Sequence, residues 1–319
     1  MPESPATHPS ACPVCGMTGG TMVLSGRDHR QGTPGEFRVV ECPSCRLCRT
    51  DPWPDDPAQW YPGEYPQHGG TEGPTARASR RALETAARSG RRMARLLAVA
   101  IPEADTGGVL RPGSRVLDIG AGTGGAVKAF RDAGHEAWGV EPSRRAVGTA
   151  HERGIPWVVE GSLEDALAAA GGLPGGQWDL VRMSQVLEHV ADPVELLRRV
   201  RGLMAPGGRL VVGVPNIRSL ARRLTGGSWD GLEFPRHLMH YDRDSLIWVL
   251  ALGGFGVRSV RTAPLLGVLP GSIDARTSGG HRQRGWSDAL PVRAAMYPVE
   301  WVLGAAGLGD GLVAVARPV

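Results

Sequence analysis

The stretch Arg115-Val-Leu-Asp-Ile-Gly-Ala-Gly-Thr-Gly-Gly125 decides the fold of this 319-residue chain. Its apolar half predicts a buried strand near 115–120, and the residues from 125 to 133 predict a helix. Gly120, Gly122 and Gly124 between them allow a positive φ and let a ligand approach the backbone closely. The N-terminus of the helix leaves N–H groups unpaired beside the turn. A strand, a glycine turn and a helix in this order indicate a nucleotide-binding corner, although a glycine-rich turn between two packed elements has the same pattern.

Two carboxylates narrow the choice of nucleotide. The glycine spacing here is G-x-G-x-G, whereas the dinucleotide fingerprint is G-x-G-x-x-G. Asp118 in the strand would repel a pyrophosphate but would attract an ammonium group, such as the one in the amino-acid tail of S-adenosylmethionine. Glu141 follows Asp118 by 23 residues, at the end of a second predicted strand. A carboxylate at that place can accept both ribose hydroxyls.

Strands and helices alternate beyond this corner. We expect strands near 136–141, 157–160, 178–183 and 208–214, and helices near 143–153, 162–170 and 192–204. A helix at 242–252 and strands at 257–263 and 311–317 follow. This alternation predicts an α/β fold: a Rossmann-like, doubly wound, mostly parallel sheet with helices on both faces and the ligand at the carboxyl ends of the strands.

Three motifs carry a resemblance to a known family. They are the segment 116–124, Gly139-Val-Glu-Pro-Ser143 and Asp179-Leu-Val-Arg-Met-Ser-Gln-Val-Leu-Glu-His189. In their order and spacing, residues 75–319 resemble a class I S-adenosylmethionine-dependent methyltransferase. The resemblance implies an antiparallel last strand and, before it, an insertion at about 265–310. The sequence of this insertion predicts a loop at 267–285 and an apolar helix at 292–306, which could cap the active site, form a dimer face or contact a membrane. The resemblance also implies that the cofactor contacts Asp118, Gly120, Ala121, Gly122, Glu141, Pro142, Ser162, Leu163, Ser184 and Gln185. Many relatives have an acidic residue for the adenine where Ser162 and Leu163 stand here.

The N-terminal region contains two Cys-x-x-Cys turns. Cys12 and Cys15 form the first and Cys42 and Cys45 the second, with 26 residues between the turns. Two such turns place four thiolates around one tetrahedral zinc, and a site with four protein ligands is structural. Four incidental reduced cysteines and a redox pair are the alternatives, but two matched pairs favour metal. Cys48 is expected to be buried rather than a ligand.

Small-molecule methyltransferases with an N-terminal zinc ribbon share this layout, including enzymes that methylate carbon atoms of deoxysugars. The resemblance extends to the aromatic segment Trp60-Tyr-Pro-Gly-Glu-Tyr65. In relatives such tyrosines lie over the active site, whereas packing between domains is the alternative role. We therefore expect three parts: a zinc-ribbon module with an aromatic connector at 1–65, a linker and arginine-rich helix at 66–105, and the methyltransferase domain at 106–319.

Two histidine segments are candidates for the chemistry. His189 follows the fourth predicted strand of the sheet, and His237 lies in Phe234-Pro-Arg-His-Leu-Met-His-Tyr241, which resembles the Pro-Arg-His segment of the family. A histidine titrates near working pH and suits a general base. We predict His237 or His189 as the base and Arg236 as the substrate anchor. A structural hydrogen bond at the start of a loop is the other role open to each histidine.

Composition sets the remaining expectations. The formal charge of +4 makes no strong case for nucleic acid. Seven arginines against one glutamate at 77–100 suit an acidic partner or a solvated helix face. No apolar run reaches the ~20 residues of a membrane span, and we expect a cytoplasmic location. We expect an enzyme that acts on an O, C or N atom of a small molecule, possibly as a homodimer. Methylation of RNA or protein and a non-catalytic, cofactor-binding scaffold are the alternatives.

Overall fold

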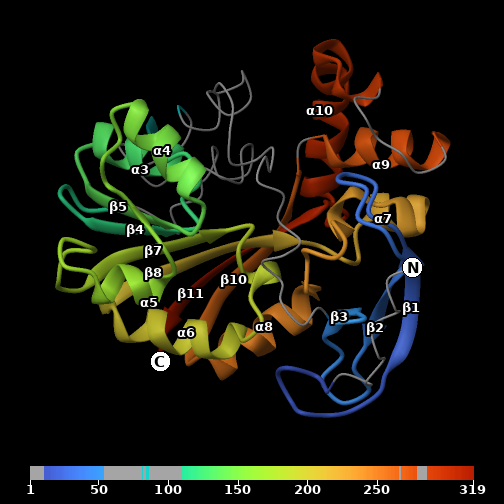
Figure 1. Cartoon of the computed structure of the whole chain (residues 1–319), viewed down its shortest axis with the longest axis horizontal. Coiled ribbons are helices and arrows are strands. Elements are labelled where there is room, and N and C mark those ends of the chain that lie inside the picture. Colours follow the sequence, from blue (N-terminus) through green and yellow to red (C-terminus); the bar gives the residue numbers. More distant parts are fainter. Residues whose placement is uncertain (1–10, 54–80, 82–83, 86–109, 266, 279–285) are drawn as a thin grey trace.

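The computed structural model describes residues 11–53, 81, 84–85, 110–265, 267–278 and 286–319 (Figure 1). The predicted linker, the aromatic segment with Tyr61 and Tyr65, and nearly all of the arginine-rich helix lie outside these residues. Within the described residues, no helix has both the length and the apolar character needed to cross a bilayer.

The central element is a seven-stranded sheet with the order β10-β11-β8-β7-β4-β5-β6. Neighbouring strands from β8 to β6 are parallel, and β11 is antiparallel to both β8 and β10. The predicted Rossmann-like fold with an antiparallel last strand is therefore confirmed. The strands are β4 (Arg115–Ile119), β5 (Glu136–Glu141), β6 (Val158–Glu160), β7 (Trp178–Ser184), β8 (Met204–Pro215), β10 (Phe255–Ala263) and β11 (Gly311–Pro318).

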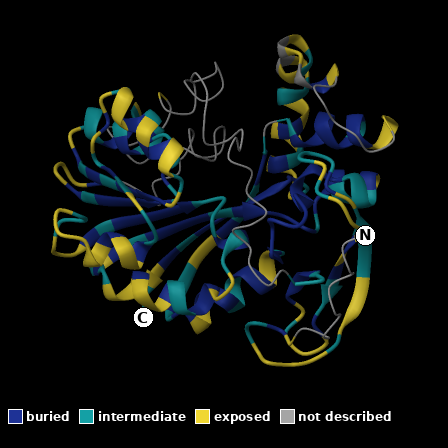
Figure 2. Cartoon of the chain, in the orientation of Figure 1, coloured by how far each residue is buried: buried dark blue, intermediate teal, exposed yellow. Residues whose placement is uncertain are grey.

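Helices cover both faces of this sheet because successive strand residues point to opposite sides. In β4, Val116 packs in the cluster that contains α3 and α4, whereas Leu117 and Ile119 pack in the cluster that contains α5, α6 and α8. Figure 2 shows the strands as the buried layer between more exposed helices. The helices are α3 (Gly125–Asp132), α4 (Arg144–Glu152), α5 (Leu163–Ala168), α6 (Pro193–Gly202), α7 (Leu220–Thr225) and α8 (Arg243–Leu252).

A second sheet has four strands in the order β1-β2-β3-β9, all antiparallel (Figure 1). Three of them, β1 (Thr21–Gly26), β2 (Phe37–Glu41) and β3 (Cys48–Asp51), belong to the N-terminal residues 11–53, which we call the ribbon. The fourth, β9 (Met239–His240), comes from the segment after β8. The sequence did not predict β9. Its pairing with β3 joins the ribbon to the rest of the protein by hydrogen bonds between strands as well as by the covalent chain.

The insertion differs in part from the prediction. The expected loop at 267–285 begins with a helix, α9 (Val268–Thr277), and the expected apolar helix is α10 (Leu290–Ala305). Pro270 falls in the first turn of α9, where its missing N–H is not needed. Glu300 of α10 accepts the N–H groups of Gly267 and Leu269. The helix therefore depends on a cap from a distant residue, which local sequence cannot reveal.

Candidate active site and metal centre

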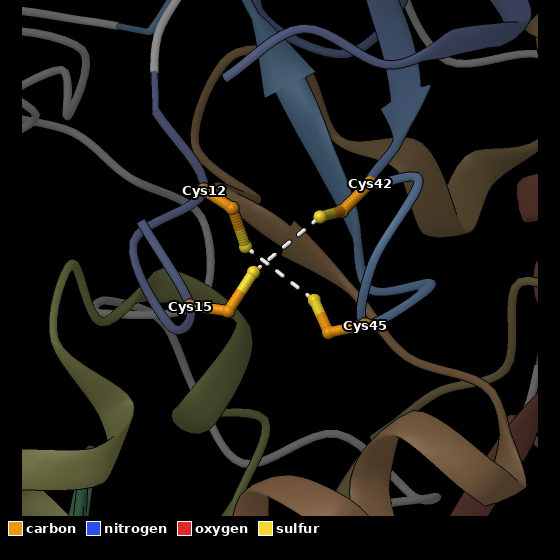
Figure 3. Close-up of side chains that lie close together, drawn as sticks. All are labelled: Cys12, Cys15, Cys42 and Cys45. Atoms are coloured by element: carbon orange, nitrogen blue, oxygen red, sulfur yellow. Dashed lines mark hydrogen bonds between the residues drawn. The ribbon is translucent and has the colours of Figure 1, made fainter. Parts of the chain in front are cut away.

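The four predicted cysteines of the ribbon come together. Their sulfur atoms all lie within 4.8 Å of one another. The Sγ atoms of Cys12 and Cys45 are 3.5 Å apart, and so are those of Cys15 and Cys42 (Figure 3). A tetrahedral zinc with Zn–S bonds of about 2.3 Å has sulfurs about 3.8 Å apart, so this geometry fits the metal.

The two knuckles repeat one backbone pattern. In the first, the N–H of Gly16 bonds the carbonyl of Cys12, and in the second the N–H of Arg46 bonds the carbonyl of Cys42. Both end in a positive φ, 71° at Gly16 and 61° at Arg46. Burial raises the pKa of the Cys12 and Cys45 thiols. At Cys42 burial also acts to raise the pKa, but hydrogen bonds from the second knuckle and from Cys15 lower it to about 7. Four thiolates this close repel one another unless a cation lies between them, so the cysteines would hold zinc as a structural ion. Cys48 is buried in β3 and outside this cluster, as expected.

The glycine turn after β4 has the backbone that the sequence predicts. The φ angle is 72° at Gly120, 53° at Gly122 and 77° at Gly124. A Cβ atom on Gly120 would lie 2.4 Å from Cγ2 of Val186, whereas one on Gly122 would meet no described atom within 4 Å. Gly122 therefore leaves room for a ligand. Gly120 lets the turn after β4 approach the turn after β7.

Glu141 joins the turns after β4 and β5. Its Oε2 accepts the N–H of Gly122 at 2.9 Å, and its Oε1 accepts the N–H of Ser143 at 2.8 Å. The side chain is buried, whereas the neighbouring Pro142 is exposed. The N–H groups of Gly120 and Ala121 both bond the carbonyl of Val140, which fixes the two turns together. The predicted ribose acceptor thus stands beside the glycine turn.

Asp118 has a protein partner that the prediction missed. Its carboxylate receives Nη1 of Arg182 at 3.0 Å, and both side chains are buried. Burial raises the pKa of Asp118, although the guanidinium opposes that shift. Asp118 and Arg182 are direct partners in the β4–β7 register. Arg182 lies within the motif 179–189, but only the register shows that it faces Asp118. An ammonium group of a ligand would have to compete with this guanidinium for the carboxylate.

The predicted adenine residues have structural roles. Ser162 caps α5, since its Oγ accepts the N–H of Asp165 and donates to the carboxylate of the same residue. Leu163 is buried in the same hydrophobic cluster as Leu117 and Ile119 of β4. Any adenine contact here would therefore come chiefly from backbone atoms of the turn. Ser184 is the last residue of β7 and Gln185 follows it, with its N–H bonded to the carbonyl of Gly213.

The two predicted histidines meet. The rings of His189 and His237 pack edge to face with centroids 4.6 Å apart. Nδ1 of His189 is 3.1 Å from the carbonyl oxygen of Arg236, and Nδ1 of His237 is 2.9 Å from that of Gly231. A carbonyl only accepts, so each Nδ1 carries a proton. In the neutral rings, each Nε2 therefore keeps its lone pair.

Glu188 completes a cluster that the sequence reasoning did not single out, although the residue stands in the quoted motif beside His189. Glu188, His189 and His237 each offer a ligand atom within 4.8 Å of the others. Within the described part of the chain, neither carboxylate oxygen of the fully buried Glu188 has a hydrogen-bond partner. Burial raises the pKa of Glu188 well above its ordinary value and lowers that of His237 well below it. Burial therefore favours the neutral forms of Glu188 and His237, and His237 can accept a proton through Nε2.

Arg236 does not stand where a substrate anchor would. Its Nη1 and Nη2 contact the two carboxylate oxygens of Asp28 at 2.9 and 3.0 Å, and its Nε lies 3.4 Å from Glu233. The side chain is fully buried in these ion pairs. The structure therefore favours a structural role for Arg236 over the predicted contact with substrate.

The chain is similar to known proteins in sequence and in fold. The family model described as a methyltransferase domain matches residues 81–260. The chain belongs to this methyltransferase family. It is 31% identical over 161 residues to the C-methyltransferase NovU of Streptomyces niveus, covering 50% of this chain and 36% of that protein. It is 32% identical over 123 residues to a ubiquinone biosynthesis O-methyltransferase of Cereibacter sphaeroides, covering 37% and 48%.

The chain thus spans less than half the length of these curated relatives. Among solved structures, a possible histamine N-methyltransferase from Thermotoga maritima is 21% identical, with a TM-score of 0.43 and coverage of 66% and 84%. The mitomycin 7-O-methyltransferase MmcR is 18% identical, with a TM-score of 0.45 and coverage of 76% and 54%.

Replacing Cys12 with serine should release zinc, because a structural site needs all four ligands. Metal content by plasma emission spectrometry should fall from one zinc per chain to well below one. Cys48→Ser is the matched control and should keep its zinc. Full zinc occupancy in Cys12→Ser would contradict the assigned ligand set.

Replacing Glu141 with glutamine should weaken binding of S-adenosylhomocysteine. Loss of a charge-assisted hydrogen bond costs about 1.5–3 kcal/mol, which is about a 10- to 100-fold rise in Kd. Isothermal titration calorimetry measures this change. The exposed Glu152 of α4 provides the control Glu152→Gln, and equal affinities of the two variants would remove Glu141 from the cofactor site.

Proposed function

We propose that this chain uses S-adenosylmethionine to methylate an oxygen or carbon atom of a small molecule. One observation carries the proposal: the cluster of His189, His237 and Glu188 begins two residues after Val186, the side chain that packs on Gly120 of the cofactor turn. A proton acceptor therefore adjoins the place where the methyl donor would bind. The family supports methyl transfer, and the named relatives support a small acceptor.

The cofactor turn and Glu141 would hold the methyl donor. When bound, S-adenosylmethionine supplies an already activated methyl group, so alignment provides much of the rate. Gly122 would let the donor approach the backbone, and Glu141 would accept its ribose hydroxyls. Asp118 is held by Arg182, so we assign the ammonium of the donor a weaker contact with this carboxylate than the motif alone implies.

The acceptor needs a base when its nucleophile is a hydroxyl or an acidic C–H group, whereas an amine needs only to be neutral. Nε2 of His237 has the lone pair for this task. Its ring is fixed by the carbonyl of Gly231, and Glu233 lies 3.7 Å from Nε2, where its carboxylate would stabilise the imidazolium that forms. A buried base with these neighbours favours oxygen or carbon acceptors over nitrogen.

Further parts of the assignment rest on the sequence. We propose that the chain divides into three parts at residues 65 and 105. We also propose that the insertion at 265–310 forms a cap over the acceptor and that the ribbon holds a structural zinc. A cytoplasmic location and a homodimer stay predictions.

The first experiment is calorimetric titration with S-adenosylhomocysteine, with NAD as the control ligand. Micromolar binding of the first and none of the second supports the cofactor assignment. Transfer of labelled methyl is then measured on phenols and on enolisable ketones. Failure to bind S-adenosylhomocysteine, or transfer to amines alone, would contradict the proposal.

His237→Gln should slow transfer about 10²- to 10⁴-fold, the range that general-base catalysis supplies, with affinity for S-adenosylhomocysteine unchanged. His135→Gln is the control, because His135 is also buried but immediately precedes β5, at the amino end of that strand. A full rate in His237→Gln would exclude His237 as the base.

The pH profile should also be displaced. Burial, and secondarily His189, lower the pKa of His237 well below its ordinary value, so the base stays neutral as the pH falls through about 6.5, where a free histidine gains its proton. The transfer rate should therefore decline only well below pH 6.5. A rate that is halved at pH 6.5, while binding of S-adenosylhomocysteine stays constant, would contradict the buried base.

A further inference from the structure

The loop between β1 and β2 of the ribbon lies against the segment that carries His237. Nε2 of His29 is 3.0 Å from the carbonyl oxygen of Gly227. A Cβ atom on Gly26 would lie 2.5 Å from the same oxygen. The rings of Phe37 and Phe234 stack with centroids 5.6 Å apart. The ribbon and the segment 226–240 are therefore packed together at several points besides the β3–β9 pairing.

Asp28 stands at the centre of this contact and is 4% exposed. Its Oδ1 accepts the N–H groups of Arg30 and Gln31, and its Oδ2 accepts the N–H and the hydroxyl of Thr33. Burial alone would raise the pKa of Asp28, but Arg236 and these donors hold it below its ordinary value. The loop thus presents a fixed, ionised carboxylate to Arg236.

Arg236 joins this carboxylate to both histidines. Its guanidinium binds Asp28 through two parallel contacts, which fix its orientation more firmly than a single one would. Its carbonyl oxygen accepts Nδ1 of His189. His237 is the next residue, and its N–H bonds the carbonyl of Glu233. Any displacement of Arg236 would therefore move the partner of one histidine and the backbone of the other.

A second arginine, Arg30 of the loop between β1 and β2, forms ion pairs with two further carboxylates. Arg30 contacts Glu233 at 3.0 Å and Asp230 at 3.3 Å. Glu233 also contacts Arg236 and lies near Nε2 of His237. The carboxylates around the histidine pair are thus held by the ribbon as well as by their own segment.

We propose that Asp28 of the ribbon is a positioning residue for catalysis, acting through Arg236 to orient His189 and His237. The ribbon is then a part of the acceptor half of the active site, and a zinc bound by its four cysteines would stabilise the fold of the ribbon. This inference rests on the proposed function for its catalytic consequence, but the orientation of the two rings can be observed without any acceptor.

The test uses Asp28→Asn in the full, zinc-loaded chain. Zinc should stay at one per chain, and the Kd of S-adenosylhomocysteine should change less than twofold, because the cofactor turn is not in this network. Long-range ¹H–¹⁵N spectra of labelled histidine rings should show His189 and His237 in the single Nδ1–H tautomer in the parent protein. In Asp28→Asn these two signals should shift toward tautomer exchange. Variants His189→Gln and His237→Gln assign the signals.

Turnover provides the second measurement, on the acceptor found in the transfer screen. In Asp28→Asn, kcat should fall at least tenfold while KM for S-adenosylmethionine changes less than twofold. Gln31→Ala is the matched control, since Gln31 bonds Asp28 through its backbone N–H, which the substitution keeps. It should behave as the parent in both measurements.

Parent-like ring signals and kcat in Asp28→Asn would overturn the inference. If Asp28→Asn fails to fold, Thr33→Val decides, because it removes one donor to Asp28 and keeps the ion pair. A smaller shift of the same two ring signals supports the proposal, and no shift overturns it. Failure of the proposed function has a different signature: His237→Gln then turns over at full rate, whereas the ring signals still respond to Asp28→Asn.

Discussion

Two charges that are 208 residues apart in sequence, Asp28 and Arg236, have to be paired because both are buried. Loss of one partner from such a pair costs about 3–5 kcal/mol, since the other is left as an uncompensated buried charge. The pairing therefore fixes the place of the ribbon on the rest of the molecule. It also fixes the segment between β8 and α8, which carries His237 and supplies β9. The four cysteines, which would hold zinc, lie at the opposite end of β1 and β2 from the loop of Asp28.

The two halves of the proposed site are built in different ways. The cofactor half consists of short turns at the carboxyl ends of parallel strands, and its geometry follows from positive φ angles and from one carboxylate, Glu141, that bonds two of the turns. The acceptor half consists of side chains from distant segments, held by ion pairs and by backbone carbonyls. A mutation in the first half should change binding of the donor, whereas a mutation in the second should change the rate of transfer.

The fold could be predicted because its signals are local. The apolar residues Val116, Leu117 and Ile119 and the glycines that follow them predict a strand and a turn within a dozen residues. The cysteine spacing predicts the two knuckles in the same way. Contacts between distant segments left no such signal. The pairing of β3 with β9, the cap that Glu300 gives to α9, and the Asp118–Arg182 pair each depend on register or tertiary placement. The sequence could not show that Arg236 is paired, because its partner, Asp28, lies 208 residues away in the loop between β1 and β2.

The position of β9 also has a consequence for synthesis of the chain. β3 ends at Asp51 and its partner strand begins at Met239, so the ribosome has to add 239 − 51 = 188 residues before the second sheet can be completed. At about 5–20 residues per second this takes about 10–40 s. During that time the outer edge of β3 has no native strand beside it, and an open edge can pair with another chain. Early binding of zinc would fold the two knuckles but would leave this edge exposed. We therefore expect the growing chain to be prone to aggregation until residue 240 has emerged.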